Sequence, residues 1–287
     1  MTRVLVTGGT GIVGRFLLPR LLAEGMEAHA LSRRPQPPDA IHWHAADVTS
    51  ERWSRGLPRV DLMIHAAPLW LLPPLLPALR RLGVARLIAF GSTSRHTKVD
   101  SPSPGERAVA EALMRAEADL AAQGGFLTWT VFRPTLIYGA GLDQNVSAIA
   151  RFIQRFGFFP VAGSAAGRRQ PVHAGDLAEA CLQAFRAPVT FGQCFDLGGG
   201  ETIGYREMVG RIFAALERRP RIVSVPIPAL RAAAGLAAYL PGLRSLDPAM
   251  IDRMNQDLVF DLAPARDAFG YAPRPFQPQR DDLGRRA

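Results

Sequence analysis

Three glycines near the start of the chain have the spacing of a phosphate-binding turn. Gly8, Gly11 and Gly14 follow the apolar run Val4–Val6 and precede an amphipathic segment. Only glycine allows a tight turn from strand to helix and a close approach of pyrophosphate to the backbone, and the free N–H groups at the helix start favour its charge. An ordinary glycine turn is the alternative. The predicted cofactor contacts of this motif are Thr7, Gly8, Gly9, Thr10, Gly11, Ile12, Val13 and Gly14.

The residues after the next apolar run could select between the two nicotinamide cofactors. Ser32, Arg33 and Arg34 directly follow the segment Glu27–Leu31. An acidic residue here would bind a ribose 2′-hydroxyl, whereas an arginine accommodates a 2′-phosphate through charge and bidentate geometry. Because none of the three is acidic, we expect NADP(H) to be preferred over NAD(H). A solvated basic turn is the alternative interpretation.

Two further loops supply candidate cofactor contacts. Asp47 and Val48 are suitably placed for the adenine edge, although Asp47 is equally typical of an ordinary turn. Ala66, Ala67 and Pro68 supply small residues where the backbone must approach a cofactor, although a simple loop would look similar.

The elements that must position these residues alternate along the chain. The predicted strands are Val4–Val6, Glu27–Leu31, Ile41–His44, Asp61–His65, Arg86–Phe90 and Thr128–Arg133. The predicted helices are Gly11–Glu24, Leu75–Leu82 and Glu106–Gln123. Such alternation predicts an α/β fold, a Rossmann-like doubly wound parallel sheet with helices on both faces. We expect a nucleotide-binding domain over residues 1–160, to which Thr190–Leu197 could return, and a smaller C-terminal substrate-binding lobe over residues 161–287.

Composition argues against several other classes of protein. The 287 residues carry a formal charge of +9, but the arginines are scattered as pairs rather than in a stripe with aromatics, so we expect no nucleic-acid partner. Cys181 and Cys194 have no metal-ligand or CxxC spacing, so we expect no metal. No apolar stretch is long and uninterrupted enough to span a membrane. The first predicted strand begins at once, so we expect no signal peptide and a cytoplasmic location.

Several motifs together resemble the extended short-chain dehydrogenase/reductase superfamily, of the NAD(P)-dependent epimerase/dehydratase type. They are Thr7–Gly14, His65–Ala67, Phe90–Ser94, Phe132–Gly139, Gln170–Ala180 and Phe195–Gly199. The resemblance extends over nearly the whole chain. It implies that Pro134 and Leu136 lie near the nicotinamide ring, with packing at a strand end as the alternative. It also implies a small-molecule substrate. If that substrate is a nucleotide sugar, it is anionic and Arg169 is expected to contact it. Relatives often form homodimers, so a homodimer is among the expected assemblies.

The catalytic residues of this superfamily are only partly present. Its members usually carry Tyr-x-x-x-Lys, in which the ammonium lowers the pKa of the phenol. No such pair occurs in this chain, and the best alignment places Ser103 at the tyrosine position and Arg107 at the lysine position. Thr93, with Ser92 beside it, matches the hydroxyl that bonds the substrate oxygen, although these hydroxyls could merely cap a loop. His96, Lys98 and Tyr138 are alternative proton donors, and Tyr138 is also a candidate substrate contact.

Two functions follow from these residues. The first is an NAD(P)-dependent oxidoreductase that transfers hydride between nicotinamide and a carbonyl or hydroxyl substrate, with a non-standard proton donor. The alternative is a catalytically impaired NADP(H)-binding protein that acts as a redox sensor or a structural factor. The intact cofactor motifs fit both functions, and the missing tyrosine favours the second.

Overall fold

A seven-stranded parallel sheet forms the larger part of the molecule, of which the computed structural model describes residues 1–231 and 248–284. Its strands are β1 (Arg3–Thr7), β2 (Glu27–Ser32), β3 (His42–Ala45), β4 (Leu62–His65), β5 (Arg86–Phe90), β6 (Thr128–Pro134) and β11 (Gln193–Leu197). Their spatial order is β11-β6-β5-β4-β1-β2-β3, and every neighbouring pair is parallel. The predicted fold class is confirmed.

The strand order reverses between β1 and β4. The chain runs outward from β1 through β2 to β3, then returns to β4 and runs outward on the other side. At such a switch point the loops after the two central strands diverge and leave a crevice at their carboxyl ends, where ligands of open α/β sheets bind. The glycine turn follows β1, and the Ala66–Pro68 segment follows β4, so both candidate segments lie at this crevice.

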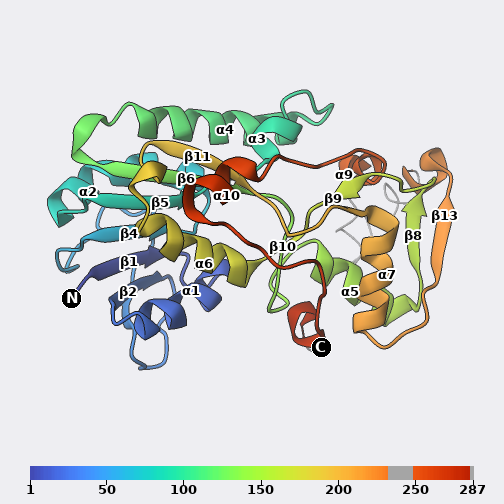
Figure 1. The fold of residues 1–287 in the computed structure, drawn as a ribbon, viewed down its shortest axis with the longest axis horizontal. Coiled ribbons are helices and arrows are strands. Elements are labelled where there is room, and N and C mark those ends of the chain that lie inside the picture. Colours follow the sequence, from blue (N-terminus) through green and yellow to red (C-terminus); the bar gives the residue numbers. More distant parts are fainter. Residues whose placement is uncertain (232–247, 285–287) are drawn as a thin grey trace.

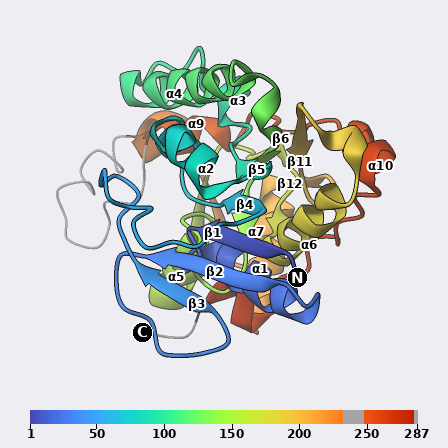
Figure 2. The ribbon, with the colours of Figure 1, turned by 90° about the vertical axis from the view of Figure 1, so that its left-hand side faces the viewer.

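Helices cover both faces of the sheet because successive residues of each strand point to opposite sides. Val4 and Val6 pack with α1 (Ile12–Ala23) and α6 (Ala174–Phe185), whereas Leu5 packs with α2 (Leu76–Leu82) and α4 (Pro104–Ala121). Figures 1 and 2 show these two helical layers on either side of the strands. A one-turn helix, α3 (Ser94–Thr97), follows β5.

A smaller lobe with its own apolar core lies beside the carboxyl ends of the strands (Figure 1). It contains α5 (Val146–Phe156), α7 (Tyr205–Ala215) and α9 (Pro248–Arg253), with the parallel pair β8 (Phe159–Ala162) and β13 (Ile222–Val225). The short pairs β7 (Ile137–Tyr138) with β10 (Val172–His173), and β9 (Arg168–Arg169) with β12 (Ile203–Gly204), join it to the sheet.

The chain passes between the two parts more than once. After the lobe begins, α6 returns to pack against α1, and β11 adds an edge strand beside β6. Near the C-terminus, α10 (Ala263–Phe269) packs on β11 and α6, whereas Phe276 enters the lobe core. We therefore propose that α6, β11 and α10 belong to the sheet domain. The expected boundary at residue 160 then separates the sheet domain from the lobe only roughly.

Candidate functional site

The glycine turn leaves the amino end of α1 free to bind an anion. Gly8 has a φ of +72°, and a Cβ on it would lie 2.6 Å from the carbonyl oxygen of Ala66. Gly11 caps α1 without a side-chain hydrogen bond, and no acidic residue occupies the first helical turn. These features fit a pyrophosphate held by backbone N–H groups, because the amides are uncapped and the local charge is favourable.

A buried histidine joins the two strands on either side of the crevice. The Nε2 atom of His65 lies 3.1 Å from the Pro68 carbonyl oxygen, which can only accept a hydrogen bond. Nε2 therefore carries the proton, and the Thr7 hydroxyl donates to Nδ1 across 2.8 Å. Complete burial lowers the pKa of His65 to about 4, against the opposing effect of the Pro68 carbonyl. His65 is thus neutral near pH 7 and holds the loop in place.

The basic turn after β2 is open to solvent. Arg33 and Arg34 are exposed, whereas the Ser32 hydroxyl donates to the Arg34 carbonyl oxygen across 2.7 Å and shapes the turn. Asp47 accepts hydrogen bonds from the amide and hydroxyl of Thr49, which lower the pKa of its carboxyl group. These bonds support the turn role of Asp47 without excluding an adenine contact. Val48 lines a separate hollow with Leu71 and Leu75, residues that the sequence motifs did not indicate.

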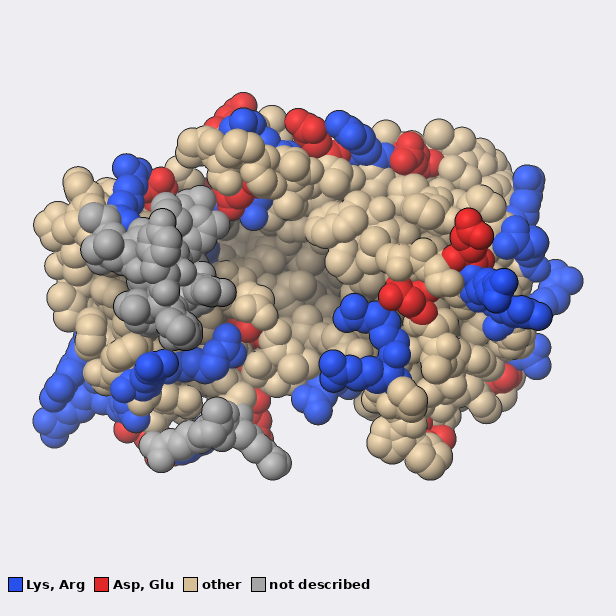
Figure 3. All heavy atoms as spheres, turned by 180° about the vertical axis from the view of Figure 1, so that it is seen from behind, with Lys and Arg blue, Asp and Glu red and all other residues tan. Residues whose placement is uncertain are grey.

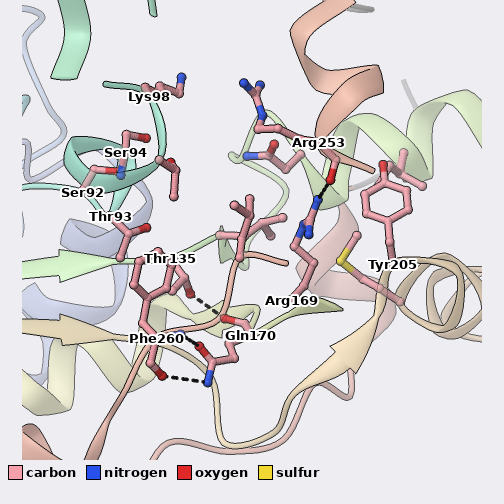
Figure 4. Close-up of a pocket in the computed structure, with 16 residues that line it drawn as sticks. Ser92, Thr93, Ser94, Lys98, Thr135, Arg169, Gln170, Tyr205, Arg253 and Phe260 are labelled. Carbon is pink, nitrogen blue, oxygen red and sulfur yellow. Dashed lines mark hydrogen bonds between the residues drawn. The ribbon is translucent and has the colours of Figure 1, made fainter. Parts of the chain in front are cut away.

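A cavity of about 240 Å³, termed the central cavity below, lies between the sheet and the lobe. From the sheet side it is lined by Ser92, Thr93, Ser94, Thr97, Lys98, Thr135 and Leu136. From the lobe and the C-terminal segment it is lined by Asn145, Ile149, Arg169, Gln170, Tyr205, Met208, Arg253, Leu258 and Phe260. Figure 3 shows the molecule hollowed between its two parts, with basic side chains beside the hollow, and Figure 4 shows the cavity in close-up.

The hydroxyl groups after β5 lie at the sheet end of the central cavity. The Thr93 hydroxyl and the Thr93 amide both lie 3.2 Å from the Pro134 carbonyl oxygen and donate to it. The Ser92 hydroxyl accepts a hydrogen bond of 3.1 Å from the Ser94 amide. Both side chains therefore have loop-shaping partners, yet both still line the cavity together with Leu136.

The opposite wall carries an arginine without an acidic partner. Arg169 is 4% exposed, and within the described ranges no carboxylate forms an ion pair with it. Its guanidinium donates to the carbonyl oxygens of Arg168, Gln256 and Arg253 and lies 5.4 Å from the centroid of the Tyr205 ring. Burial lowers the pKa of Arg169 to about 10, so it remains charged near pH 7. A buried charge without a counterion favours an anionic ligand.

The edge of the central cavity carries a cluster of three charges that connects the two parts. Glu106, at the start of α4, accepts hydrogen bonds from Arg253 of α9 and from the Ser101 hydroxyl, the latter across 2.7 Å. The Lys98 ammonium lies 3.1 Å from the same carboxylate. Although burial alone would raise the pKa of Glu106, these hydrogen bonds lower it to about 2. Glu106 is therefore ionised throughout the physiological range.

Comparison with known proteins supports the assignment made from the motifs. Residues 4–69 match the model of the NAD dependent epimerase/dehydratase family. The uncharacterized protein y4nG of Sinorhizobium fredii is 31% identical over 59% of this chain and 40% of its own length. The 4-hydroxy-2-methyl-3-oxo-4-farnesyl-3,4-dihydroquinoline-1-oxide ketoreductase of Stigmatella aurantiaca is 25% identical over 99% of this chain and 96% of that protein. The first curated relatives are covered over less than half of their own length.

The same fold occurs in a solved UDP-glucuronic acid 4-epimerase from Bacillus cereus, in complex with UDP-glucuronic acid and NAD. The two structures share a TM-score of 0.73 and 13% sequence identity, over 98% of this chain and 96% of that chain. In its motifs and its fold the chain thus resembles the extended short-chain dehydrogenase/reductase superfamily, of the NAD-dependent epimerase/dehydratase type.

The residues at the usual tyrosine and lysine positions of this superfamily do not line the central cavity. Ser103 is the N-cap residue of α4, and the Arg107 guanidinium donates to the Ser101 carbonyl oxygen across 2.6 Å. Ser101 and Arg107 thus hold the start of α4 together. The catalytic roles of Ser103 and Arg107 remain predictions, to which this geometry adds no support.

Two of the three alternative proton donors also lie outside the central cavity. Tyr138 is 1% exposed and packs against His173 and Phe276 in the lobe core, where burial raises the pKa of its hydroxyl. The structure therefore does not place Tyr138 where it could contact a substrate in this cavity. His96 points to Asp196, with 3.4 Å between Nε2 and Oδ1. Only Lys98 of the three is a lining residue.

Sequence reasoning missed Tyr205, Arg253 and Glu106. Tyr205 and Arg253 line the central cavity, but neither belongs to a motif that indicates chemistry. Glu106 reads as an ordinary acidic residue in the first turn of a helix. Their placement depends on contacts between segments far apart in the sequence, for which no local signal exists. Within the described residues, no helix is long and apolar enough to cross a membrane and no metal-binding cluster is present.

Proposed function

We propose that this protein is a nicotinamide-dependent oxidoreductase acting on a carbonyl or hydroxyl group of a small anionic substrate. The observation that carries the proposal is the central cavity, which extends from Thr93 and Leu136 at the sheet to the buried cation Arg169 in the lobe, which forms no ion pair with a carboxylate of the described residues. The sheet end adjoins the crevice suited to a dinucleotide, and the lobe end suits an anion. One molecule in the cavity could therefore present its reacting carbon to the cofactor while Arg169 binds its charged end.

The chain has the residues needed to hold such a cofactor. The amides at the start of α1 would bind the pyrophosphate, and Pro134 and Leu136 would border the nicotinamide. When bound, the cofactor supplies or accepts a hydride ion at its nicotinamide ring. The contribution of the protein would be to orient the substrate oxygen towards the Thr93 hydroxyl, whose proton would turn from the Pro134 carbonyl oxygen to that oxygen and stabilise its charge.

We also propose NADP(H) as the preferred cofactor, because Arg33 and Arg34 are exposed at the end of β2 and no acidic residue belongs to that turn. Titration of NADPH and NADH by cofactor fluorescence should give tighter binding of NADPH. Arg33→Ala should reduce this preference, whereas Arg115→Ala, on the exposed face of α4, should leave it unchanged. Equal affinities for the two cofactors in the wild-type protein would contradict the proposal.

Two relatives suggest what the substrate could be. The Bacillus cereus structure contains UDP-glucuronic acid, and Arg169 could bind the diphosphate of a nucleotide sugar in the same way that arginine binds other phosphates. The Stigmatella aurantiaca relative is named as a ketoreductase, and the apolar residues Ile149, Met208 and Leu258 of the cavity would suit a ketone with an apolar body. A panel of UDP-sugars and small ketones, followed by NADPH consumption and product analysis, tests both classes.

A binding protein without turnover is the second candidate function. The observation that favours it is the position of Ser103 and Arg107, which occupy the usual catalytic positions in sequence but do not line the central cavity. Such a protein would bind NADPH tightly and convert no member of the panel. Measurable turnover that disappears in Thr93→Val would exclude this candidate.

A further inference from the structure

The single lysine of this chain lies in the central cavity. Lysine and arginine together number 34, and Lys98 is the only lysine among them. Arginine therefore supplies all the others of these 34 side chains, both on the surface and in the core. Arginine can replace lysine as a solvated charge or as an ion-pair partner, but its guanidinium does not release a proton under ordinary conditions. The position that retains lysine borders the candidate site of proton transfer.

Lys98 and Thr93 line the same cavity from one short segment. Lys98 directly follows α3, five positions after Thr93, and its side chain is 23% exposed. Figure 4 shows Thr93 and Lys98 on one side of the cavity and Arg169 and Tyr205 on the other, with Lys98 above Thr93 in this view. A substrate oxygen bonded to the Thr93 hydroxyl would thus lie on the same side of the cavity as the lysine chain.

The other ionisable groups that line the central cavity are poor proton donors. Arg169 and Arg253 carry guanidinium groups, which hold their protons near pH 7. Tyr205 lies in the opposite wall, and burial raises its pKa to about 12, so its hydroxyl gives up a proton reluctantly. The hydroxyls of Ser92, Ser94 and Thr93 are weaker acids still. Among the described residues that line the cavity, Lys98 is left as the candidate.

Neighbouring charges hold the ammonium at the edge of the central cavity. Glu106 lies 3.1 Å from the Lys98 Nζ atom, and Arg253 shares that carboxylate from the lobe side. One carboxylate therefore serves two cations, and the cluster keeps a net positive charge. Arg169 and Tyr205 line the same cavity from the lobe, while His96 of the preceding helix α3 lies 3.4 Å from Asp196. Glu106 is a positioning residue that limits the motion of the lysine chain.

We propose that Lys98 is the proton donor of this protein, in place of the missing tyrosine, and this inference rests on the oxidoreductase function proposed above. In the reducing direction the carbonyl carbon of the substrate would accept the hydride that a bound nicotinamide cofactor supplies, and the electron pair of the C=O π bond would move to oxygen, which leaves the cofactor oxidised. One N–H bond of Lys98 breaks as its proton bonds to that oxygen, which leaves an alcohol and a neutral amine. Water then returns a proton to the amine.

Kinetics of two variants test this role. With NADPH and ethyl 4-chloroacetoacetate as a ketone probe, Lys98→Met should lower kcat about 100-fold or more, the range expected for loss of a general acid. Lys98→Arg should be equally impaired, because guanidinium keeps the charge but not the acidity. Arg115→Met serves as the control, with unchanged kcat and NADPH affinity.

The possible results separate the two proposals. No reduction by the wild-type protein of this probe, of the UDP-sugars or of the other ketones would overturn the oxidoreductase function and the role of Lys98 with it. Reduction that persists in Lys98→Met, or that Lys98→Arg restores, would overturn the role of Lys98 alone. Retained NADPH affinity in both variants would show that the loss of rate does not come from misfolding.

A second measurement does not depend on turnover. Reductive methylation with ¹³C-formaldehyde labels only Lys98 and the terminal amine, and comparison with Lys98→Arg assigns the two NMR signals. If the ammonium lies near the nicotinamide, saturation with NADPH and with NADP⁺ should shift the Lys98 signal to two different positions. An identical signal in the free protein and in both complexes would contradict the proposed donor.

Discussion

The Thr7 hydroxyl donates a hydrogen bond to Nδ1 of His65 across 2.8 Å and so joins the carboxyl ends of β1 and β4. These two strands flank the point where the strand order reverses. The other ring nitrogen of His65 bonds the Pro68 carbonyl oxygen. One neutral imidazole thus fixes both sides of the crevice in which we expect the cofactor.

This arrangement predicts that acid destabilises the protein through His65. The pKa of His65 is lowered from 6.5 to about 4 in the folded state, so the unfolded chain binds an additional proton between these values. The free energy of unfolding should therefore decrease as the pH falls from 6.5 to 4, by up to about 3 kcal/mol. Urea denaturation at several pH values measures this slope. His65→Gln should have a smaller slope, and an unchanged slope in that variant would refute the assignment.

The buried carboxylate of Glu117 should contribute strongly to stability. It accepts hydrogen bonds from Arg133 of 3.0 and 2.6 Å and pairs with Arg95, under the loop that carries Thr93. Glu117→Gln removes the carboxylate that pairs with Arg95 and leaves Arg133 only its longer contact of 3.8 Å with Asp196, so the free energy of unfolding should fall by about 3 kcal/mol. Glu111→Gln breaks only the exposed pair with Arg115 and should change it by about 0.5 kcal/mol or less. Denaturant titration of the two variants measures both changes in the free energy of unfolding. Equal changes in the two variants would argue against a buried ion-pair network.

Gly8 should be essential for the cofactor turn. Gly8 has a left-handed backbone, which residues with a Cβ atom rarely adopt. In addition, a Cβ at this position would lie 2.6 Å from the Ala66 carbonyl oxygen. We expect Gly8→Ala to weaken NADPH binding at least about tenfold, because backbone displacement would misplace the amides that face the phosphates. Gly105→Ala, in the first turn of α4 with the nearest atom 3.9 Å away, is the matched control and should bind normally. Fluorescence titration that gives equal affinities would contradict the model of the turn.

Arg169 should determine the affinity for anionic ligands. With UDP as the probe, Arg169→Met should weaken binding about tenfold or more in calorimetry, because hydrogen bonds to charged groups contribute about 1.5–3 kcal/mol. Arg168→Met provides the control, since Arg168 is exposed and pairs with Asp257. Circular dichroism would confirm that both variants fold. UDP binding that is equally weak in the wild-type protein and in Arg169→Met would remove the anion-binding role.

The glycine turn and the sheet could be predicted because their signals are local. Alternating apolar segments and the glycines at 8, 11 and 14 act over a few residues, and the fold follows from their repetition. The start of α4 shows where such reasoning stops. The resemblance to the superfamily places Ser103 and Arg107 at its usual catalytic positions, but their placement in space depends on how α3 and α4 meet the lobe. Tyr138 likewise looks available in the sequence and is covered by Phe276 from the C-terminal segment.

By itself the sequence determined the parallel sheet, the glycine turn after its first strand and the basic turn after its second. Only the tertiary structure decided which charged groups meet in the central cavity. Glu106 and Arg253 lie 147 positions apart, and Arg169 lies between them in the sequence. Their proximity comes from the packing of the lobe against the carboxyl ends of the strands, an interaction between distant segments that no local pattern encodes. The same packing leaves Arg169 without a carboxylate partner within the described chain and places it in one cavity with Thr93 and the single lysine.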